Sequence, residues 1–377
     1  MRGNSILVVG GGIGGLSAAI ALSDAGFAVR VVEIQNDLHS SVFGVGIIQP
    51  VNALRALGAI GCLDPCLEAG YASSGWSRLY DEAGNVVDEV RGATIPGSSL
   101  PPMNGIGRPQ LHQILTERAL ASGARIDYGV TVSTFTERAD SVDVQFTDGR
   151  QASFNLVVGA DGVRSNLRTY VAAREIQPTY NGQSAFRLTI PRDPDVDRIV
   201  SQRGRNGNFG IVPIGAETAY LYMNIVWDRA RRVRDEELPA MLIESLAPFG
   251  GPAGHAREHH VHADSQIVFR PGEWLIVEPP WHRGHVVLIG DAVHAVTPHL
   301  GQGAAQAIED GIVLADCLRR ESRTEAALTA YTERRFERCR LIVESSVRIG
   351  ARDQGRTEDF DLPALVQGMI EAMVAPI

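Results

Sequence analysis

A glycine-rich turn after the first apolar segment of the chain carries the residues best suited to bind a phosphate. The apolar run at 6–9 leads into Gly10, Gly12 and Gly15, spaced G-x-G-x-x-G, and a helix-like segment follows at 16–22. Gly10 permits a tight turn, Gly12 lets a pyrophosphate approach the backbone, and Gly15 lets the helix pack closely on the strand. The helix N-terminus then offers free N–H groups and its positive dipole end to the phosphates.

An acidic residue, Glu33, ends the second predicted strand at 28–32. A strand, a G-x-G-x-x-G turn and an acid about twenty residues later form the dinucleotide-binding fingerprint, in which the carboxylate accepts hydrogen bonds from a ribose. A glycine-rich turn can also be a plain loop, but a plain loop needs neither the flanking strands nor the acid. We therefore predict a dinucleotide site made by Gly10, Gly12, Ile13, Gly14, Gly15 and Glu33.

Two further motifs directly follow apolar strands of the kind buried in parallel sheets. Asp161-Gly162 comes after the run at 156–159, and Asp291 comes after the run at 286–289. Taken singly, Asp161-Gly162 and Gly290-Asp291 are dipeptides that are common in turns. Three motifs at the carboxyl ends of three strands instead predict one shared ligand-binding edge.

The composition excludes several classes of partner. The chain has 377 residues and a net charge of −9, which argues against nucleic acid or an anionic membrane surface as a partner. No apolar run reaches the ~18–20 residues of a membrane span, and the first strand begins at residue 5, where a signal peptide would lie. We expect a cytoplasmic protein with no integral membrane association, as a monomer or a homodimer.

Cysteines and histidines give no metal-binding pattern in the sequence. The four cysteines are scattered and predict reduced packing thiols. The stretch with His255, His259, His260 and His262 has no well-spaced acid or cysteine beside it, so no metal site is predicted. The Arg- and Glu-rich face at 333–338 is predicted to be a solvated surface.

The three motifs together resemble those of the single-component FAD-dependent aromatic hydroxylases, the para-hydroxybenzoate and salicylate hydroxylase group, over essentially the whole chain. The resemblance implies an α/β fold: a Rossmann-like FAD-binding domain of the glutathione-reductase type, an inserted antiparallel-sheet substrate domain and long C-terminal helices. The alternating apolar pattern between about 180 and 268 agrees with such an inserted sheet. The expected boundaries are 1–70, 99–178 and 268–323 for the FAD domain, 71–98 and 179–267 for the substrate domain, and 324–377 for the C-terminal helices.

The resemblance also implies which residues contact FAD. Arg108 falls near the pyrophosphate and ribityl chain, Val132 near the adenine, Asp161 at a motif shared by FAD and NAD(P)H, and Asp291 at the ribityl chain. Backbone groups would border the isoalloxazine ring, from Gly301, Gly303 and Ala304 on one side and from Gly44, Val45 and Gly46 on the other; a plain tight turn is the alternative for Gly44 and Gly46. Ala305 stands where many members have Asn, which places any side-chain contact to the flavin from that position in doubt.

The reaction implied by the resemblance is hydroxylation of a small electron-rich aromatic or heteroaromatic ring, of the phenol or hydroxypyridine type and including carboxylates. FAD would be bound tightly but non-covalently, NAD(P)H would be a transient co-substrate, and O2 would react through a C4a-hydroperoxyflavin. Another flavoenzyme of the same fold, such as an epoxidase, halogenase or reductase, and a non-enzymatic FAD-binding protein are the alternatives.

Substrate contacts are expected from the inserted sheet and the loop that faces it. Arg187 lies mid-strand, where it anchors a carboxylate or polar ring group; a salt bridge or an exposed face is the alternative. Alternation places Tyr222 on one face with Tyr220 and Asn224. The other candidates for substrate contact are Asn208, Val212, Pro298 and His299. No catalytic residue is assigned; His299 and His294 are candidate bases, with packing or a backbone hydrogen bond as the alternative for both.

Overall fold

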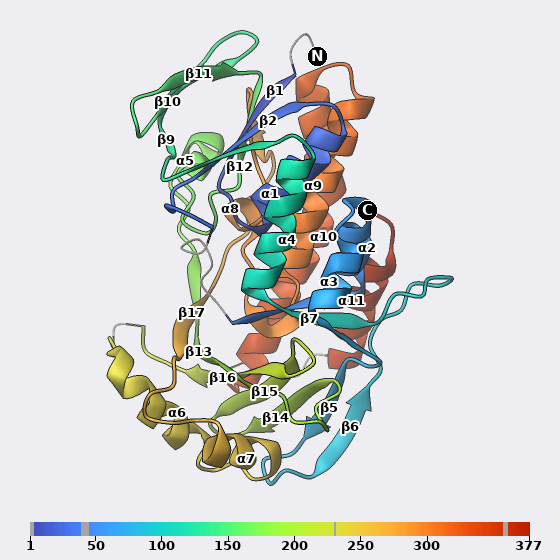
Figure 1. Ribbon diagram of the computed structural model, residues 1–377, viewed down its shortest axis with the longest axis vertical. Helices are drawn as coiled ribbons and strands as arrows, with labels where there is room; N and C mark the ends of the chain where they lie inside the picture. The colour runs from blue at the N-terminus through green and yellow to red at the C-terminus, as the bar shows by residue number, and fades with distance from the viewer. Residues whose placement is uncertain (1–3, 39–44, 230, 357–360) are drawn as a thin grey trace.

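The computed structural model describes residues 4–38, 45–229, 231–356 and 361–377, and its upper half in Figure 1 is built on a largely parallel six-stranded sheet. The central strands read as unbroken apolar runs because both faces of the sheet are covered. The strand order is β18 (His282–Arg283), β19 (Val286–Leu288), β12 (Leu156–Gly159), β1 (Ser5–Val9), β2 (Ala28–Glu33) and β8 (Arg125–Tyr128), with only β18 antiparallel.

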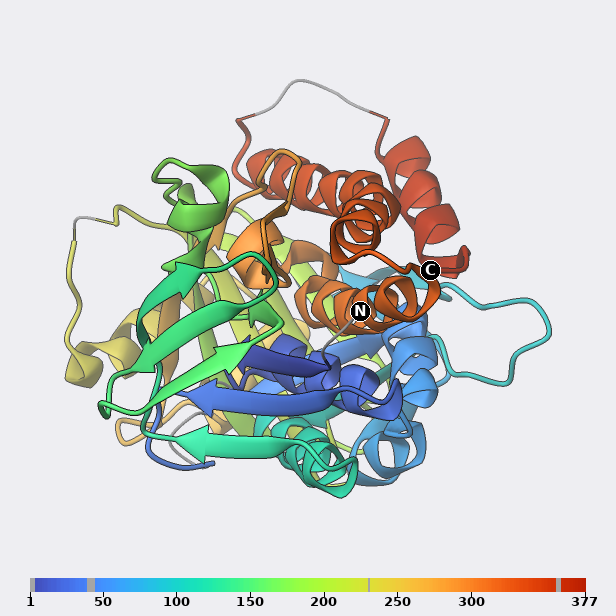
Figure 2. The same ribbon diagram turned by 90° about the horizontal axis from the view of Figure 1, so that it is seen from above.

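Long helices cover one face of this sheet, and a small antiparallel sheet lies on the other (Figure 2). The helices are α1 (Ile13–Asp24), α4 (Arg108–Ala121), α9 (Gly303–Arg320) and α10 (Thr324–Asp353), and the small sheet is β9 (Val132–Glu137), β10 (Val142–Phe146) and β11 (Gln151–Phe154). Apolar side chains from all these layers form one core. No helix within the described ranges is both long and apolar enough to cross a membrane.

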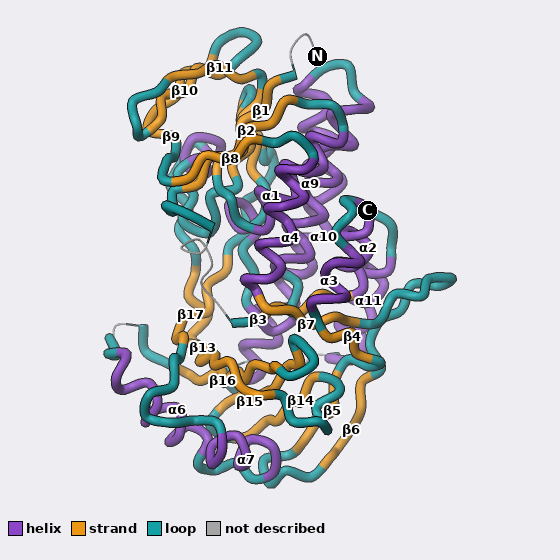
Figure 3. The backbone as a smooth tube through the Cα atoms, viewed as in Figure 1, coloured by secondary structure: helices purple, strands orange, loops and turns teal. Residues whose placement is uncertain are grey.

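A seven-stranded sheet forms the lower half of Figure 1, and helices α6 (Leu238–Leu246) and α7 (Gly251–His259) cover its outer face. A second core, containing Phe186, Phe209 and Leu221, lies under these helices. The strand order is β17 (Val268–Trp274), β13 (Thr179–Pro191), β16 (Thr218–Val226), β15 (Gly207–Pro213), β14 (Ile199–Gly204), β5 (Ser77–Tyr80) and β6 (Val86–Val90). Figure 3 shows β13 and β17 extending from this sheet toward the upper half.

A short three-stranded sheet of β3 (Gly46–Pro50), β7 (Met103–Gly107) and β4 (Tyr71–Ser73) lies against the inner face of the seven-stranded sheet. Two glycines permit this close approach. A Cβ at Gly46 would lie 2.3 Å from the ring of Tyr220, and a Cβ at Gly105 would lie 1.9 Å from the carbonyl oxygen of Pro213. The remaining elements are α2 (Val51–Ala59), α3 (Leu63–Ala69), α5 (Leu167–Ala172), η1 (Asp235–Glu237), α8 (Asp291–His294), η2 (Pro298–Leu300) and α11 (Leu362–Val374).

The α/β architecture with an inserted, mainly antiparallel sheet is confirmed, and the structure adds two strands at the expected domain borders that the sequence pattern does not predict. β4 pairs with β7 rather than with the seven-stranded sheet. β17 pairs with β13, so the inserted sheet continues to Trp274 rather than ending at residue 267. Pro271 and Gly272 interrupt the strand pattern within β17, which is why the sequence pattern does not reveal this strand.

Helices α1 and α9 cross closely at a glycine, which gives a stability prediction. A Cβ at Gly311 in α9 would lie 2.6 Å from the Cα of Ala18 in α1, whereas a Cβ at Gly368 in α11 would meet no atom within 4 Å. Gly311→Ala should therefore lower the free energy of unfolding by about 1–3 kcal/mol through overpacking. Gly368→Ala should be neutral or stabilising by about 0.5–1 kcal/mol. Urea unfolding of both variants measures the difference, and equal effects would contradict the close crossing.

Candidate active site

The three sequence motifs meet at one edge of the six-stranded sheet. Gly10, Asp161 and Asp291 follow the carboxyl ends of β1, β12 and β19, which are consecutive neighbours in the sheet. In open α/β sheets this edge is where ligands bind. The topology therefore brings together the predicted cofactor residues that lie furthest apart in the sequence.

The turn before α1 requires glycine at two positions. Gly10 has a φ of +110°, and a Cβ there would lie 2.3 Å from the carbonyl oxygen of Ala160. A Cβ at Gly15 would lie 1.9 Å from the carbonyl oxygen of Gly10, so only glycine lets the helix pack this close to the strand. The space beside Gly12 is open, and no side chain caps α1 and no acidic residue lies in its first turn. The first-turn N–H groups are thus available to an anion.

The other residues of this turn have packing roles as well. The side chain of Ile13 is buried in the first core, which leaves its backbone N–H as its contribution to the turn. A Cβ at Gly14 would lie 3.1 Å from that of Ala307, so Gly14 lets α1 pack against α9. Glu33 is buried, and its carboxylate accepts hydrogen bonds from the N–H of Gly11 at 2.7 Å and of Gln35 at 2.9 Å. These bonds hold the carboxylate beside the turn.

Asp161 has an oxygen that lacks a protein partner. Its Oδ2 accepts hydrogen bonds from the backbone N–H groups of Asn166 and Leu167, at 2.9 and 3.4 Å. Its Oδ1 is buried without a hydrogen-bond partner among the described residues. Burial raises the pKa of this carboxyl group. An unpaired buried acceptor is costly, and a donor from a bound ligand would satisfy it.

Asp291 and Arg108 carry opposite charges and interact electrostatically. Asp291 begins α8, and its side chain is open to solvent although the surrounding protein raises its pKa through desolvation, as expected for a group in a deep cleft. The exposed guanidinium of Arg108, at the start of α4, partly opposes that rise and also lowers the pKa of Arg187. Arg108 is therefore close enough to interact electrostatically with both the six-stranded and the seven-stranded sheet. A ligand that extends from Asp291 to Arg187 would therefore lie beside Arg108.

Those predicted flavin-ring residues that the structure describes lie at the start of β3, at the end of η2 and at the start of α9. Gly301 ends η2 with a φ of +62°, and a Cβ there would contact Ile48 at 3.4 Å. Gly303 and Ala304 begin α9, and Val45 packs against the cluster of Met103, Val212 and Tyr220. Gly46 faces Tyr220, as described above, and Gly44 lies outside the described residues. Val132, which was predicted to lie near the adenine, begins β9 and packs against the first core.

The register of the seven-stranded sheet places the predicted substrate residues on its inner face. Arg187 on β13 pairs with Tyr222 on β16, and Tyr222 pairs with Gly210 on β15. Asn208 and Val212 lie on β15 two residues before and after Gly210, so they share its face of the sheet. A Cβ at Gly210 would lie 2.4 Å from the ring of Tyr222, so this glycine gives the tyrosine its space. Burial raises the pKa of Tyr222 to about 12, so its hydroxyl stays protonated at neutral pH. Asn208 Oδ1 is buried with no partner among the described residues.

Arg187 itself forms no hydrogen bond or ion pair with the residues that the structure describes. Its side chain is partly buried and enclosed by protein, and this desolvation lowers its pKa. Arg270 of β17, which the sequence analysis missed, lies opposite Ala185 and adds a second positive charge that acts on Arg187. The salt bridge offered as the alternative for Arg187 is thus absent among the described residues, and an anionic ligand would supply the missing counter-charge.

The two candidate histidines have different surroundings. His299 lines a small hollow with Pro298, Arg187, Asn224 and Arg270. Its Nε2 lies 2.9 Å from Gln183 Oε1, its Nδ1 lies 3.0 Å from Thr297 Oγ1, and burial lowers its pKa, so the ring is neutral at neutral pH. The hollow adjoins a larger cavity of about 300 Å³, with which it shares Ser184, Arg270 and Pro271.

His294 lies away from this hollow, in a buried ion-pair network. Its Nε2 is 2.6 Å from Asp310 Oδ2. Burial alone would lower the pKa of His294, but the negative charge of Asp310 outweighs it and raises that pKa well above its usual value. A charged, fully paired imidazole is unsuited to remove a proton from a substrate, so we do not retain His294 as a candidate base.

The same network corrects the expectation for the face at 333–338. Arg335 is 1% exposed, and its guanidinium contacts Glu309 and Asp310 at 2.7 Å each. Arg338 also binds Glu309, at 2.7 Å. The charged pattern hides this burial, because the acidic partners lie on α9 and the sequence gives no sign that α9 and α10 pack together here.

Comparisons with known proteins agree with this geometry. A family model described as "FAD binding domain" matches residues 4–346. "Putative FAD-dependent monooxygenase YetM" of Bacillus subtilis is 34% identical over 92% of this chain and 93% of its own length. The 6-hydroxynicotinate 3-monooxygenase of Pseudomonas fluorescens is 31% identical over 88% of both chains. A variant of Klebsiella pneumoniae HpxO, solved with FAD, superposes with a TM-score of 0.83 at 24% identity, covering 98% of this chain and 94% of that one.

Proposed function

Because this chain belongs to the FAD-dependent aromatic monooxygenases that share the FAD binding domain, we propose that it uses NAD(P)H and O2 to hydroxylate a small aromatic or heteroaromatic ring that carries an anionic group. The observation that carries the choice of substrate is Arg187, an enclosed guanidinium without a counter-ion among the described residues. A carboxylate or a ring oxyanion would pair with it through charge-assisted hydrogen bonds.

FAD fits the edge where the three motifs meet. The open N-terminus of α1 suits its pyrophosphate and Glu33 its ribose, while Asp161 Oδ1 lacks a donor and Asp291 faces the cleft. Bound there, FAD would supply the activation of O2. We expect it to be held tightly but non-covalently, because all of these are hydrogen-bonding or charged groups.

The chain's own residues would bind and orient the substrate ring. Arg187 and Arg270 give the hollow a positive potential, which favours an anion. The apolar group of Ile48, Met103 and Val212 excludes water on the side toward the short sheet. Asn208 Oδ1 and the Tyr222 hydroxyl offer polar contacts to a ring substituent, while the neutral His299, whose two ring nitrogens already contact Gln183 and Thr297, would form part of the wall of the hollow.

NAD(P)H would bind transiently, because the dinucleotide fingerprint before α1 is the one that FAD would occupy. The cavity of about 300 Å³ beside the hollow is bordered by Arg229, Arg231 and Arg270 and by one acid, Asp235. Arg229 pairs with Glu273 at 2.7 Å, so Arg231 and Arg270 are the charges that would suit a coenzyme phosphate. The likeness to 6-hydroxynicotinate 3-monooxygenase supports a hydroxylated heteroaromatic carboxylate as one substrate type.

A paired screen of substrates tests this proposal. Phenolic and hydroxypyridine carboxylates, each with its decarboxylated analogue, would be added to the FAD-loaded protein while NADH or NADPH oxidation is followed. We expect a carboxylate to stimulate oxidation more than its analogue and to gain one oxygen atom in the product mass. Equal stimulation within every pair would contradict the anion requirement, and oxidation without an oxygenated product would favour a reductase.

Replacement of Asp291 tests the third motif. Asp291→Ala should weaken FAD binding by roughly one to two decades, since a hydrogen bond to a charged group contributes about 1.5–3 kcal/mol. Equilibrium dialysis of FAD measures the change, with Asp88→Ala on the distant, exposed β6 as the control. Unchanged FAD affinity in a folded Asp291→Ala protein would place the ribityl chain elsewhere.

A further inference from the structure

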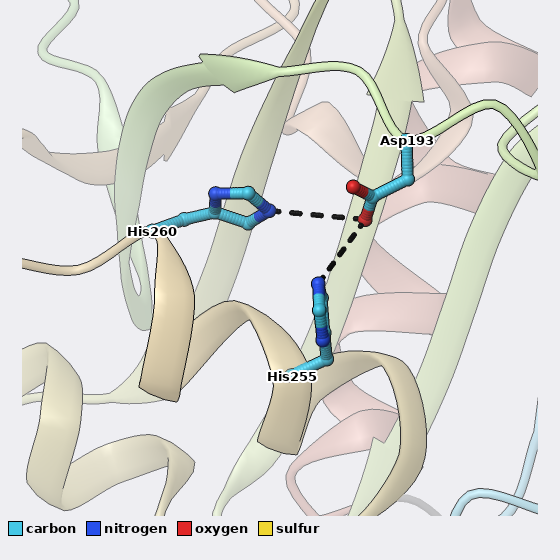
Figure 4. Close-up of side chains that lie close together, drawn as sticks. All are labelled: Asp193, His255 and His260. Carbon is cyan, nitrogen blue, oxygen red and sulfur yellow. Dashed lines mark ion pairs between the residues drawn. The ribbon is translucent and has the colours of Figure 1, made fainter.

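A second cluster of ligand-type side chains lies on the outer side of the seven-stranded sheet, away from the cleft. His255 belongs to α7, His260 follows the end of that helix, and Asp193 follows the end of β13. Figure 4 shows both imidazole rings directing their Nε2 atoms at the same carboxylate oxygen of Asp193. No well-spaced acid lies beside these histidines in the sequence, because Asp193 is distant in the chain and the fold brings it to them.

The distances in this cluster are too long for hydrogen bonds. His255 Nε2 lies 3.6 Å and His260 Nε2 3.8 Å from Asp193 Oδ2, and the three ligand atoms all lie within 4.8 Å of one another. A tetrahedral zinc ion bound at about 2.0–2.2 Å holds neighbouring ligand atoms roughly 3.4 Å apart. The spacing is thus close to that of ligands around a shared ion.

One member of the cluster is buried and lacks a hydrogen-bond partner. The side chain of His260 is 10% exposed, and its Nε2 has no partner among the described residues. Asp193 and His255 are more exposed, at 39% and 50%, which gives an ion access from solvent.

Another cluster of metal-ligand side chains is fully buried and is already paired within the protein. His294, Asp310 and Cys339 also lie within 4.8 Å of one another. Asp310, however, already pairs with His294 at 2.6 Å and with the Arg335 guanidinium at 2.7 Å. The adjacent positive charge of Arg335 opposes a cation there.

We propose that Asp193, His255 and His260 form a binding site for a divalent transition-metal ion of the Zn²⁺ type, with water completing its coordination. Two imidazole nitrogens and one carboxylate suit zinc and its neighbours better than Mg²⁺ or Ca²⁺, which prefer oxygen ligands. The ion would tie α7 to the loop after β13, the strand that carries Arg187. It would therefore stabilise the seven-stranded sheet from outside and take no part in the reaction.

Zinc binding to the FAD-loaded protein, with any affinity tag removed, tests the site. Titration calorimetry with ZnCl2 should show one ion per chain, and saturating Zn²⁺ should raise the melting temperature because only the folded state holds the three ligands together. His260→Gln and Asp193→Asn should each weaken binding at least 10–100-fold, about the loss seen when even an outer partner of a metal ligand is removed. MgCl2 should give no comparable heat or shift.

His262→Ala is the matched control, because His262 lies in the same stretch but outside the cluster. It should bind Zn²⁺ as the wild type does. Absence of Zn²⁺ binding in the wild type would overturn the proposal. Equal Zn²⁺ binding by the wild type and Asp193→Asn would also overturn it. Asp193 lies in an exposed loop outside α7, so this substitution is the one least expected to disturb the helix.

Discussion

Replacing Arg187 with alanine is expected to leave FAD content normal while hydroxylation becomes uncoupled from NAD(P)H oxidation. The guanidinium has no protein counter-ion among the described residues, and Arg187 lines the hollow beside His299. Losing a charge-assisted contact of about 1.5–3 kcal/mol should raise KM by roughly one to two decades. A loosely held ring is also displaced from the reacting position, so more hydrogen peroxide and less hydroxylated product should form.

Two further variants make this result specific. Arg187→Lys keeps the charge but not the planar fork, so it should recover only part of the coupling. Arg78→Ala removes an arginine from β5 of the same sheet, where it pairs with Glu89 at 2.7 Å outside the cleft, and should leave KM and coupling unchanged. Full coupling with an unaltered KM in Arg187→Ala would show that this side chain does not touch the substrate.

Replacing Asp310 with asparagine is expected to cause the largest loss of stability. The carboxylate is fully buried and binds both His294 at 2.6 Å and Arg335 at 2.7 Å. Burial alone would raise its pKa, but these two cations lower the pKa to about 2, so it is charged throughout the neutral range. Its loss leaves buried positive charge uncompensated, a change that typically costs about 3–5 kcal/mol.

The same helix offers a control for this prediction. Asp316 also binds arginines, at 2.7–3.2 Å, but near the surface, where such pairs contribute about 0–1 kcal/mol. Urea unfolding at saturating FAD should show a much lower midpoint for Asp310→Asn than for Asp316→Asn. Similar midpoints for the two variants would mean that the buried network contributes little to stability.

The sequence predicted best those parts of the structure that depend on residues close together in the chain. The turn from Gly10 to Gly15 combines close backbone contacts with an open helix N-terminus, so its spacing, together with the flanking strands and Glu33, predicts its structure. Alternation also places Tyr220, Tyr222 and Asn224 on one face, as the register confirms. In both cases the deciding interactions lie within a few residues or follow from strand geometry.

What the sequence could not predict depends on contacts between distant segments. Arg335 belongs to a run of charges that is typical of a surface, and its burial follows only from the packing of α10 against Glu309 and Asp310. Asp193 reaches His260 only because α7 covers the outer face of the seven-stranded sheet. Neither partner leaves a local pattern in the chain.

The most direct test of the proposed function is the source of the oxygen in the product. The FAD-loaded protein would be incubated with NAD(P)H and the best aromatic carboxylate from the screen under oxygen-18 gas in ordinary water. We predict that the product gains a single oxygen-18 atom and that no product forms when the carboxylate is omitted. An unlabelled oxygen in the product, or NAD(P)H oxidation that yields only hydrogen peroxide with every aromatic acid, would contradict the assignment of this chain as an aromatic hydroxylase.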